Sequence, residues 1–116
     1  MTELFQYECE ACSADTPRMT TDEVNEWLGQ LHNWQVVEKK AVPQLLKVYE
    51  FSDFMSALAF ANNVGDLAES NGHHPALLVE WGRVTVRWWT HKIAGLHKND
   101  LIMASKTDLL LATHNM

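Results

Sequence analysis

Residues whose side chains can transfer protons are concentrated in one short stretch of the 116-residue chain. This stretch is Glu69-Ser70-Asn71-Gly72-His73-His74-Pro75. The two histidines follow a predicted helix, and the partial negative charge of a helix C-terminus favours protonated imidazole. Glu69 is close enough in sequence to act in the same direction. The stretch therefore predicts a site for general acid–base chemistry.

His91 and Asp100 are further candidates for this site, because His91 ends the last predicted strand and Asp100 lies in the first turn of the last predicted helix. Composition alone leaves two alternatives open for the adjacent histidines: a solvated or helix-capping role, and metal binding. The chain lacks H-x-H, H-x-x-x-H and H-E-x-x-H, in which one face presents two ligands to one ion. We therefore expect no metal. The other three histidines, His32, His97 and His114, are expected to lie on the surface.

The only two cysteines, Cys9 and Cys12, form a C-x-x-C motif. A tetrahedral zinc site would need a second pair of ligands, and a thioredoxin-like site would place the motif at the start of a helix that follows a strand. We expect a pair of reduced thiols without a function of this kind.

Composition and charge restrict the class of protein. Hydrophobic residues make up 47% of the chain and charged residues 21%, which is typical of one globular domain. With 9 basic and 15 acidic residues the net charge is −6, which disfavours a nucleic-acid-binding surface. The sequence shows no signal peptide and no apolar run of membrane-spanning length, so we expect a cytoplasmic protein without a membrane contact.

The first half of the chain is predicted to contain a tail, a helix, a hairpin and a second helix. Residues 1–18 show no apolar periodicity and are expected to be an N-terminal tail, with the domain in residues 19–116. Thr20 and Glu23 form a predicted capping box that starts a helix over 20–32. Strands are predicted at 34–38 and 45–51, joined by a loop that contains Pro43. Ser52 is the predicted cap of a long helix that ends at Gly72.

The second half predicts another hairpin and a final helix. Residues 76–81 and 83–90 are expected to pair around a turn at Gly82, so that Trp88 and Trp89 face opposite sides of the sheet. A helix is predicted over 98–113. The order α-β-β-α-β-β-α predicts an α+β fold, a four-stranded antiparallel sheet with the helices packed on one face.

A pattern of spaced residues then identifies a family resemblance. The pattern combines Glu69-x-x-x-His73-His74-Pro75 with Trp81, Thr90-His91, Gly95-Leu96 and Asp100. It resembles the signature of the pterin-4a-carbinolamine dehydratases, and the element order resembles that family over residues 19–113. Leu96-His97-Lys98 replaces the small capping residue expected before the last helix, so the sequence offers no standard cap for its start.

The resemblance implies a lyase that dehydrates 4a-hydroxytetrahydropterin, the product of aromatic amino acid hydroxylases, to quinonoid dihydropterin. It implies no cofactor and a homo-dimer or homo-tetramer. His73, His74 and His91 are the implied catalytic residues, with Glu69, Pro75, Trp81 and Asp100 supporting the site. We expect His74 and His91 to exchange protons with the substrate. His73 would be a second acid or a hydrogen-bond donor to the pterin ring.

Two other classes of function are kept as alternatives. Animal relatives of this family also serve as dimerisation partners of a transcription factor, a role in which the histidines would not be needed. A metal-dependent hydrolase would use the histidines as ligands, and a stoichiometric ion in the purified protein would identify it.

Overall fold

The first helix begins at the predicted capping box. The computed structural model describes residues 4–10, 13 and 15–114, and its first α-helix is α1, Thr21–Leu28. The hydroxyl of Thr20 accepts from the Glu23 N–H at 3.2 Å, and Glu23 Oε1 accepts from the Thr20 N–H at 2.9 Å. These bonds from Thr20 lower the pKa of the Glu23 carboxyl from its usual value. The helix ends earlier than predicted because Gly29, a poor helix former, follows Leu28.

The first hairpin is tighter than the sequence predicts. Strand β1, Gln35–Lys39, pairs with β2, Val42–Glu50, around Lys40 and Ala41. Both turn residues have positive φ, 53° and 65°, as a two-residue type I′ turn requires. The predicted loop around Pro43 is therefore wrong. Pro43 is the second residue of β2, opposite Glu38, where the strand tolerates a residue without an N–H.

The long helix α2, Phe54–Asn71, has Asp53 and not Ser52 as its cap. The Asp53 carboxylate accepts from the Ser56 N–H at 2.7 Å, which lowers the pKa of Asp53 from its usual value. The helix ends as predicted at Gly72, whose φ of 60° is in the left-handed region.

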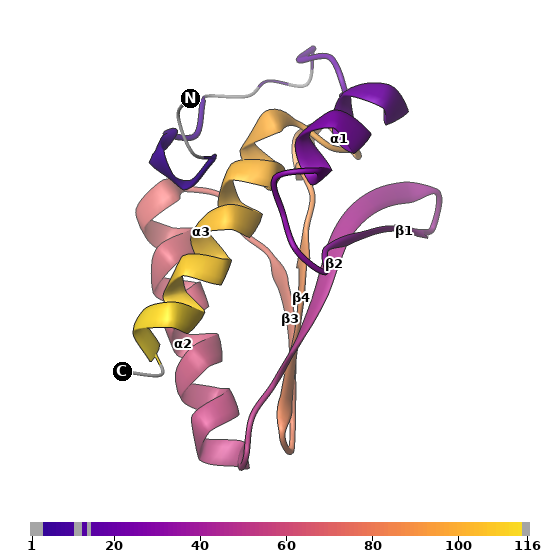
Figure 1. The fold of residues 1–116 in the computed structure, drawn as a ribbon. Coiled ribbons are helices and arrows are strands. Elements are labelled where there is room, and N and C mark those ends of the chain that lie inside the picture. Colours follow the sequence, from indigo (N-terminus) through magenta and orange to yellow (C-terminus); the bar gives the residue numbers. More distant parts are fainter. Residues whose placement is uncertain (1–3, 11–12, 14, 115–116) are drawn as a thin grey trace.

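The second hairpin completes a single antiparallel sheet. Strands β3, Ala76–Glu80, and β4, Arg83–Trp88, pair around a turn in which Gly82 has a φ of 78°. The sheet order is β1-β2-β4-β3, and Figure 1 shows α2 and α3 side by side on one face of it. The short 3-10 helix η2, His91–Ile93, leads to α3, Lys98–His114. The predicted α+β architecture and element order are confirmed.

The two adjacent tryptophans, Trp88 and Trp89, differ in their burial and in their contacts. Trp88 is fully buried beneath the helices, and its indole N–H donates to the Thr107 hydroxyl of α3 at 3.1 Å. The next residue, Trp89, packs against the ring of His91. Trp89 follows the last residue of β4 and is also partly buried against the core, so the expectation that the two rings face opposite sides of the sheet stays a prediction.

A second polar contact attaches α3 to the sheet. The Asp108 carboxylate accepts from the Trp34 indole at 3.0 Å, from Lys47 Nζ at 2.7 Å and from the Tyr49 hydroxyl. Burial, together with the Asp108 charge, raises the pKa of Tyr49 well above its usual value. The contact fixes the rotation of α3 over β2.

The N-terminal segment differs from the tail that the sequence predicts. Its 3-10 helix η1, Leu4–Gln6, packs against α3, and the Leu4 side chain is 2% exposed. The interaction depends on isolated apolar residues in a turn, so no helical or strand periodicity reveals it. Cys12 lies outside the described residues. None of the helices in the described part of the chain combines the length and hydrophobicity of a membrane span.

Two glycine substitutions are expected to change the stability in opposite directions. Gly95 lies against Arg18, whose Nε donates to the Ile93 carbonyl at 2.6 Å, and a Cβ at position 95 would come within 2.7 Å of Arg18 Cδ. We expect Gly95→Ala to cost about 1–2 kcal/mol, because the exposed Arg18 side chain must move aside and lose its bond to the Ile93 carbonyl. Gly65, inside α2, has no atom within 4 Å of such a Cβ, and Gly65→Ala should add about 0.5–1 kcal/mol. Urea unfolding measures both, and a stabilised Gly95→Ala variant would contradict the packing described here.

Candidate active site

His73 is the most firmly held of the three predicted catalytic histidines. It follows the left-handed Gly72 directly, so the end of α2 sets its position. Its Nε2 lies 2.6 Å from Oδ1 of Asp100, and its side chain is 11% exposed. The ring also stacks on Trp88 with an interplanar angle of 12°. The His73 ring is therefore held at Nε2 by Asp100 and on one face by Trp88.

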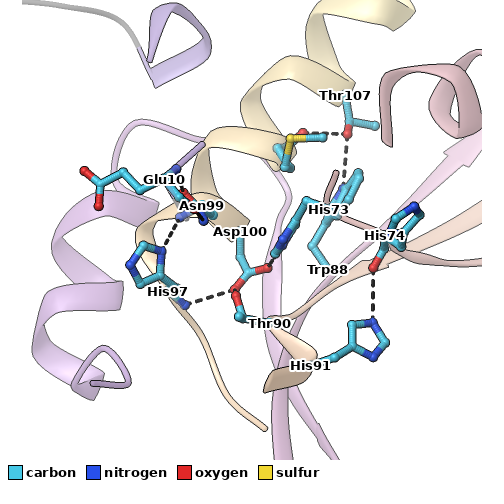
Figure 2. A network of polar contacts seen from close by, with 11 residues as sticks. Glu10, His73, His74, Trp88, Thr90, His91, His97, Asn99, Asp100 and Thr107 are labelled. Carbon is cyan, nitrogen blue, oxygen red and sulfur yellow. Dashed lines mark hydrogen bonds and ion pairs between the residues drawn. The ribbon is translucent and has the colours of Figure 1, made fainter. Parts of the chain in front are cut away.

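Asp100 is the acceptor around which the site is built. Its side chain is fully buried, and its Oδ2 accepts from the Thr90 hydroxyl at 2.8 Å and from the His97 N–H at 2.9 Å. With His73 on the other oxygen, one carboxylate joins the end of α2, the end of the β3–β4 hairpin and the start of α3 (Figure 2). Buried carboxylates are stable only when hydrogen bonds and charges are arranged around them in this way.

His74 and His91 lie at the open side of the site. Nε2 of His74 is 2.8 Å from Oε1 of Glu69, and both side chains are mostly exposed. Nε2 of His91 donates to the backbone carbonyl of His74 at 3.2 Å. The start of β3 and the residues after β4 lie at the same end of their hairpin, which brings the three histidines together although 18 positions separate His73 from His91.

These histidines line one pocket of about 520 Å³. The remaining lining residues come from the end of α2, from the segment after β4, from the N-terminal segment and from α3: Asn71, Gly72, Thr90, Lys92, Cys9, Glu10 and Asn99. A volume of this size suits a small-molecule ligand. In the described part of the chain, no three His, Cys, Asp or Glu side chains are arranged to hold a metal ion.

The structure brings most, but not all, of the predicted site residues together. Glu69 reaches the pocket through His74, and Pro75 lies with it along the neighbouring groove between α2 and β3. Trp81 is in the turn between β3 and β4 and is 74% exposed. The turn is the opposite end of the hairpin from the histidines, so the structure does not bring Trp81 to this pocket.

Sequence reasoning missed the residues that complete the first turn of α3. His97 precedes the helix, its Nδ1 accepts from the Asn99 N–H at 3.1 Å, and its own N–H donates to Asp100. This reciprocal arrangement resembles a capping box, and it explains how α3 starts without a small capping residue. The expectation that His97 is a surface residue is wrong. The sequence signal for this cap was Asp100, which lies three positions after His97.

Comparison with known proteins agrees with the fold and the motif. The family described as pterin 4 alpha carbinolamine dehydratase matches residues 17–110. Proteins with a provisional pterin-4-alpha-carbinolamine dehydratase name are 52% identical in Saccharophagus degradans and 54% identical in Marinobacter nauticus. Each alignment spans 110 residues and 95% of this chain, with 97% and 99% of the relative covered.

Solved structures show the same architecture. A transcriptional coactivator/pterin dehydratase from Brucella melitensis superimposes with a TM-score of 0.74 at 32% identity, covering 81% of this chain and 98% of that one. A pterin dehydratase-like RuBisCO assembly factor of the alpha-carboxysome shares the fold, with a TM-score of 0.58 at 23% identity over 69% of this chain and 90% of that one.

The fold and the site define a small α+β domain with a pocket lined by three histidines, two of which are paired with carboxylates. Together with the match over residues 17–110, they establish the family. The chain belongs to the pterin-4-alpha-carbinolamine dehydratases.

Proposed function

We propose that the protein is a lyase that removes water from a 4a-hydroxytetrahydropterin and releases quinonoid dihydropterin. The observation that carries the proposal is the convergence of His73, His74 and His91 on one pocket, each with Nε2 against an oxygen acceptor. When Nε2–H is donated in this way, a neutral ring keeps its lone pair on Nδ1, where it can accept a proton.

The reaction needs one proton delivered and one removed. A protonated histidine donates to the departing 4a-oxygen, the bond between this oxygen and C4a breaks, and water leaves. The lone pair of N5 forms the new C4a=N5 bond, and a neutral histidine takes the N5 proton. Each turnover leaves the acid neutral and the base protonated, so a proton returns from the base to the acid through solvent, to which both rings are exposed, before the next turnover.

The geometry favours a division of labour among the three rings. His74 and His91 are the exposed rings and would exchange protons with the substrate and solvent. His73 is held by Asp100 and Trp88, which suits a second acid or a hydrogen-bond donor that orients the pterin. Glu69 is placed to balance the positive charge that His74 carries when it is protonated.

The proposal includes the setting of the reaction. No cofactor enters the chemistry, since the substrate supplies both the leaving hydroxyl and the proton. The enzyme would work in the cytoplasm and recycle the pterin of an aromatic amino acid hydroxylase.

We also propose a homo-dimer or homo-tetramer, because Val48 and Leu78 flank Thr85 on the uncovered sheet face and are 44% and 55% exposed.

The same exposed face favours one alternative, a protein-binding module of the coactivator type. An assay of 4a-hydroxytetrahydropterin dehydration distinguishes the two functions. The reaction is followed by absorbance with the purified full chain. Turnover above the spontaneous rate supports the lyase. A rate equal to that of buffer, from a folded protein, would contradict it and favour the binding module.

A further inference from the structure

The N-terminal segment contributes to the same pocket as the histidines. We name residues Leu4–Glu10 the N-terminal strap. Two of its residues, Cys9 and Glu10, line the pocket together with Asn99. The strap precedes the residues matched by the family, 17–110, so the family motif does not account for this part of the wall.

Asn99 holds the strap through its backbone. The Glu10 N–H donates to Asn99 Oδ1 at 2.8 Å, and Asn99 Nδ2 donates to the Glu10 carbonyl at 2.7 Å. Asn99 is 2% exposed, while the Glu10 carboxylate points away from His73 in Figure 2. One buried amide thus satisfies both backbone groups of Glu10 and fixes the chain at this point of the pocket.

A second attachment lies beside the first. Lys98 Nζ lies 4.0 Å from the centroid of the Tyr7 ring and 5.0 Å from that of the Trp27 ring, and the two rings meet edge to face. With Leu4 buried against α3, the strap is held at both ends and in its middle.

The first turn of α3 connects the strap to the acid–base site. Lys98 holds Tyr7, Asn99 holds Glu10, and Asp100 holds His73. Three consecutive residues of one helical turn therefore place the strap and the histidine ring relative to each other.

We infer that Asn99 is a positioning residue for substrate binding: it holds Cys9 and Glu10 as a wall of the pterin pocket. The inference rests on the proposed function. In this role the wall holds the pterin ring and takes no part in the proton transfers, so it contributes equally to binding of the substrate and of the transition state. Loss of such an interaction raises KM and leaves kcat unchanged.

Asn99→Ala tests this assignment in the full chain. Loss of two hydrogen bonds corresponds to roughly a tenfold rise in KM, with kcat within about twofold of the original value. The dissociation constant of a reduced pterin without the 4a-hydroxyl should rise by the same factor. The matched control is Asn63→Ala, an exposed asparagine of α2 outside the pocket, which should change neither constant.

A substitution in the strap provides an independent variant if Asn99→Ala folds poorly. Glu10→Pro removes the N–H that Asn99 accepts, and we expect it to raise KM more than Glu10→Ala, which keeps this N–H. If Asn99 acts through the strap, the KM of the Asn99→Ala, Glu10→Pro double variant should be close to that of either single variant, well below the product of the two effects.

The outcomes distinguish this inference from the proposed function. An original chain that neither dehydrates the carbinolamine nor binds a reduced pterin contradicts both. An active original chain with an unchanged KM in Asn99→Ala overturns the strap inference alone. So does a fall in kcat at constant KM, which would show that Asn99 acts on the histidines through Asp100.

Discussion

Replacing His74 or His91 by alanine is expected to lower the rate of 4a-hydroxytetrahydropterin dehydration at least about tenfold, and replacing both is expected to lower it further. Removing a group that transfers a proton in the transition state typically costs about 10²–10⁴ in rate. The lower limit is smaller here because the elimination also proceeds spontaneously and the remaining histidines can partly substitute for one another. Initial rates at saturating substrate measure the effect, with far-UV circular dichroism to show that the fold is retained.

The choice of control histidine follows from the structure. His97 lacks the freedom expected of a surface residue, because its ring accepts the Asn99 N–H at the start of α3. His32 is exposed, lies outside the pocket and contacts Lys47 through its backbone carbonyl, so His32→Ala should leave the rate unchanged. A double His74, His91 variant that is folded and retains the original turnover would contradict the acid–base assignment.

The sequence predicts those elements whose signals are local. The capping box of Thr20 and Glu23 and the stop at Gly72 each depend on residues within one turn, and both are present. Alternation in the last strand predicts that one of Trp88 and Trp89 joins the core but not which of them, and the structure shows Trp88 fully buried. The turn at Lys40 and Ala41 was missed because neither residue is one that commonly adopts positive φ.

The sequence predicts which three histidines meet at one pocket but not which acceptor each of them contacts. The motif predicts that His73, His74 and Asp100 belong to the site. Only the fold shows that His73 pairs with Asp100 and His74 with Glu69. The contact of Glu10 with Asn99 joins residues 89 positions apart and leaves no periodic trace in the sequence. Trp81 illustrates the converse, because its place in the motif implied a supporting role, whereas the predicted turn at Gly82 already put it at the other end of the hairpin from the histidines.

Asp100→Ala is expected to lower the free energy of unfolding by about 3–5 kcal/mol. The carboxylate is fully buried and accepts from His73, Thr90 and the His97 backbone, so its removal leaves three donors without their acceptor. The loss is this large because all three donors stay buried and desolvated after their shared acceptor is removed. Urea unfolding of the full chain measures the change. Asp66→Ala, at an exposed position in the middle of α2, is the matched control and should stay within about 0.5 kcal/mol.

Asp100→Asn separates the charge of this residue from its shape. The amide oxygen can still accept a hydrogen bond, but its NH2 group faces a donor where Asp100 presented an acceptor. We therefore expect a smaller loss of stability than in Asp100→Ala, together with a lower dehydration rate, because His73 loses the negative charge beside its ring. If both variants unfold at the urea concentration of the original chain, the three contacts of Asp100 do not hold the site together. The rate of the Asn variant then shows whether the charge alone matters for catalysis.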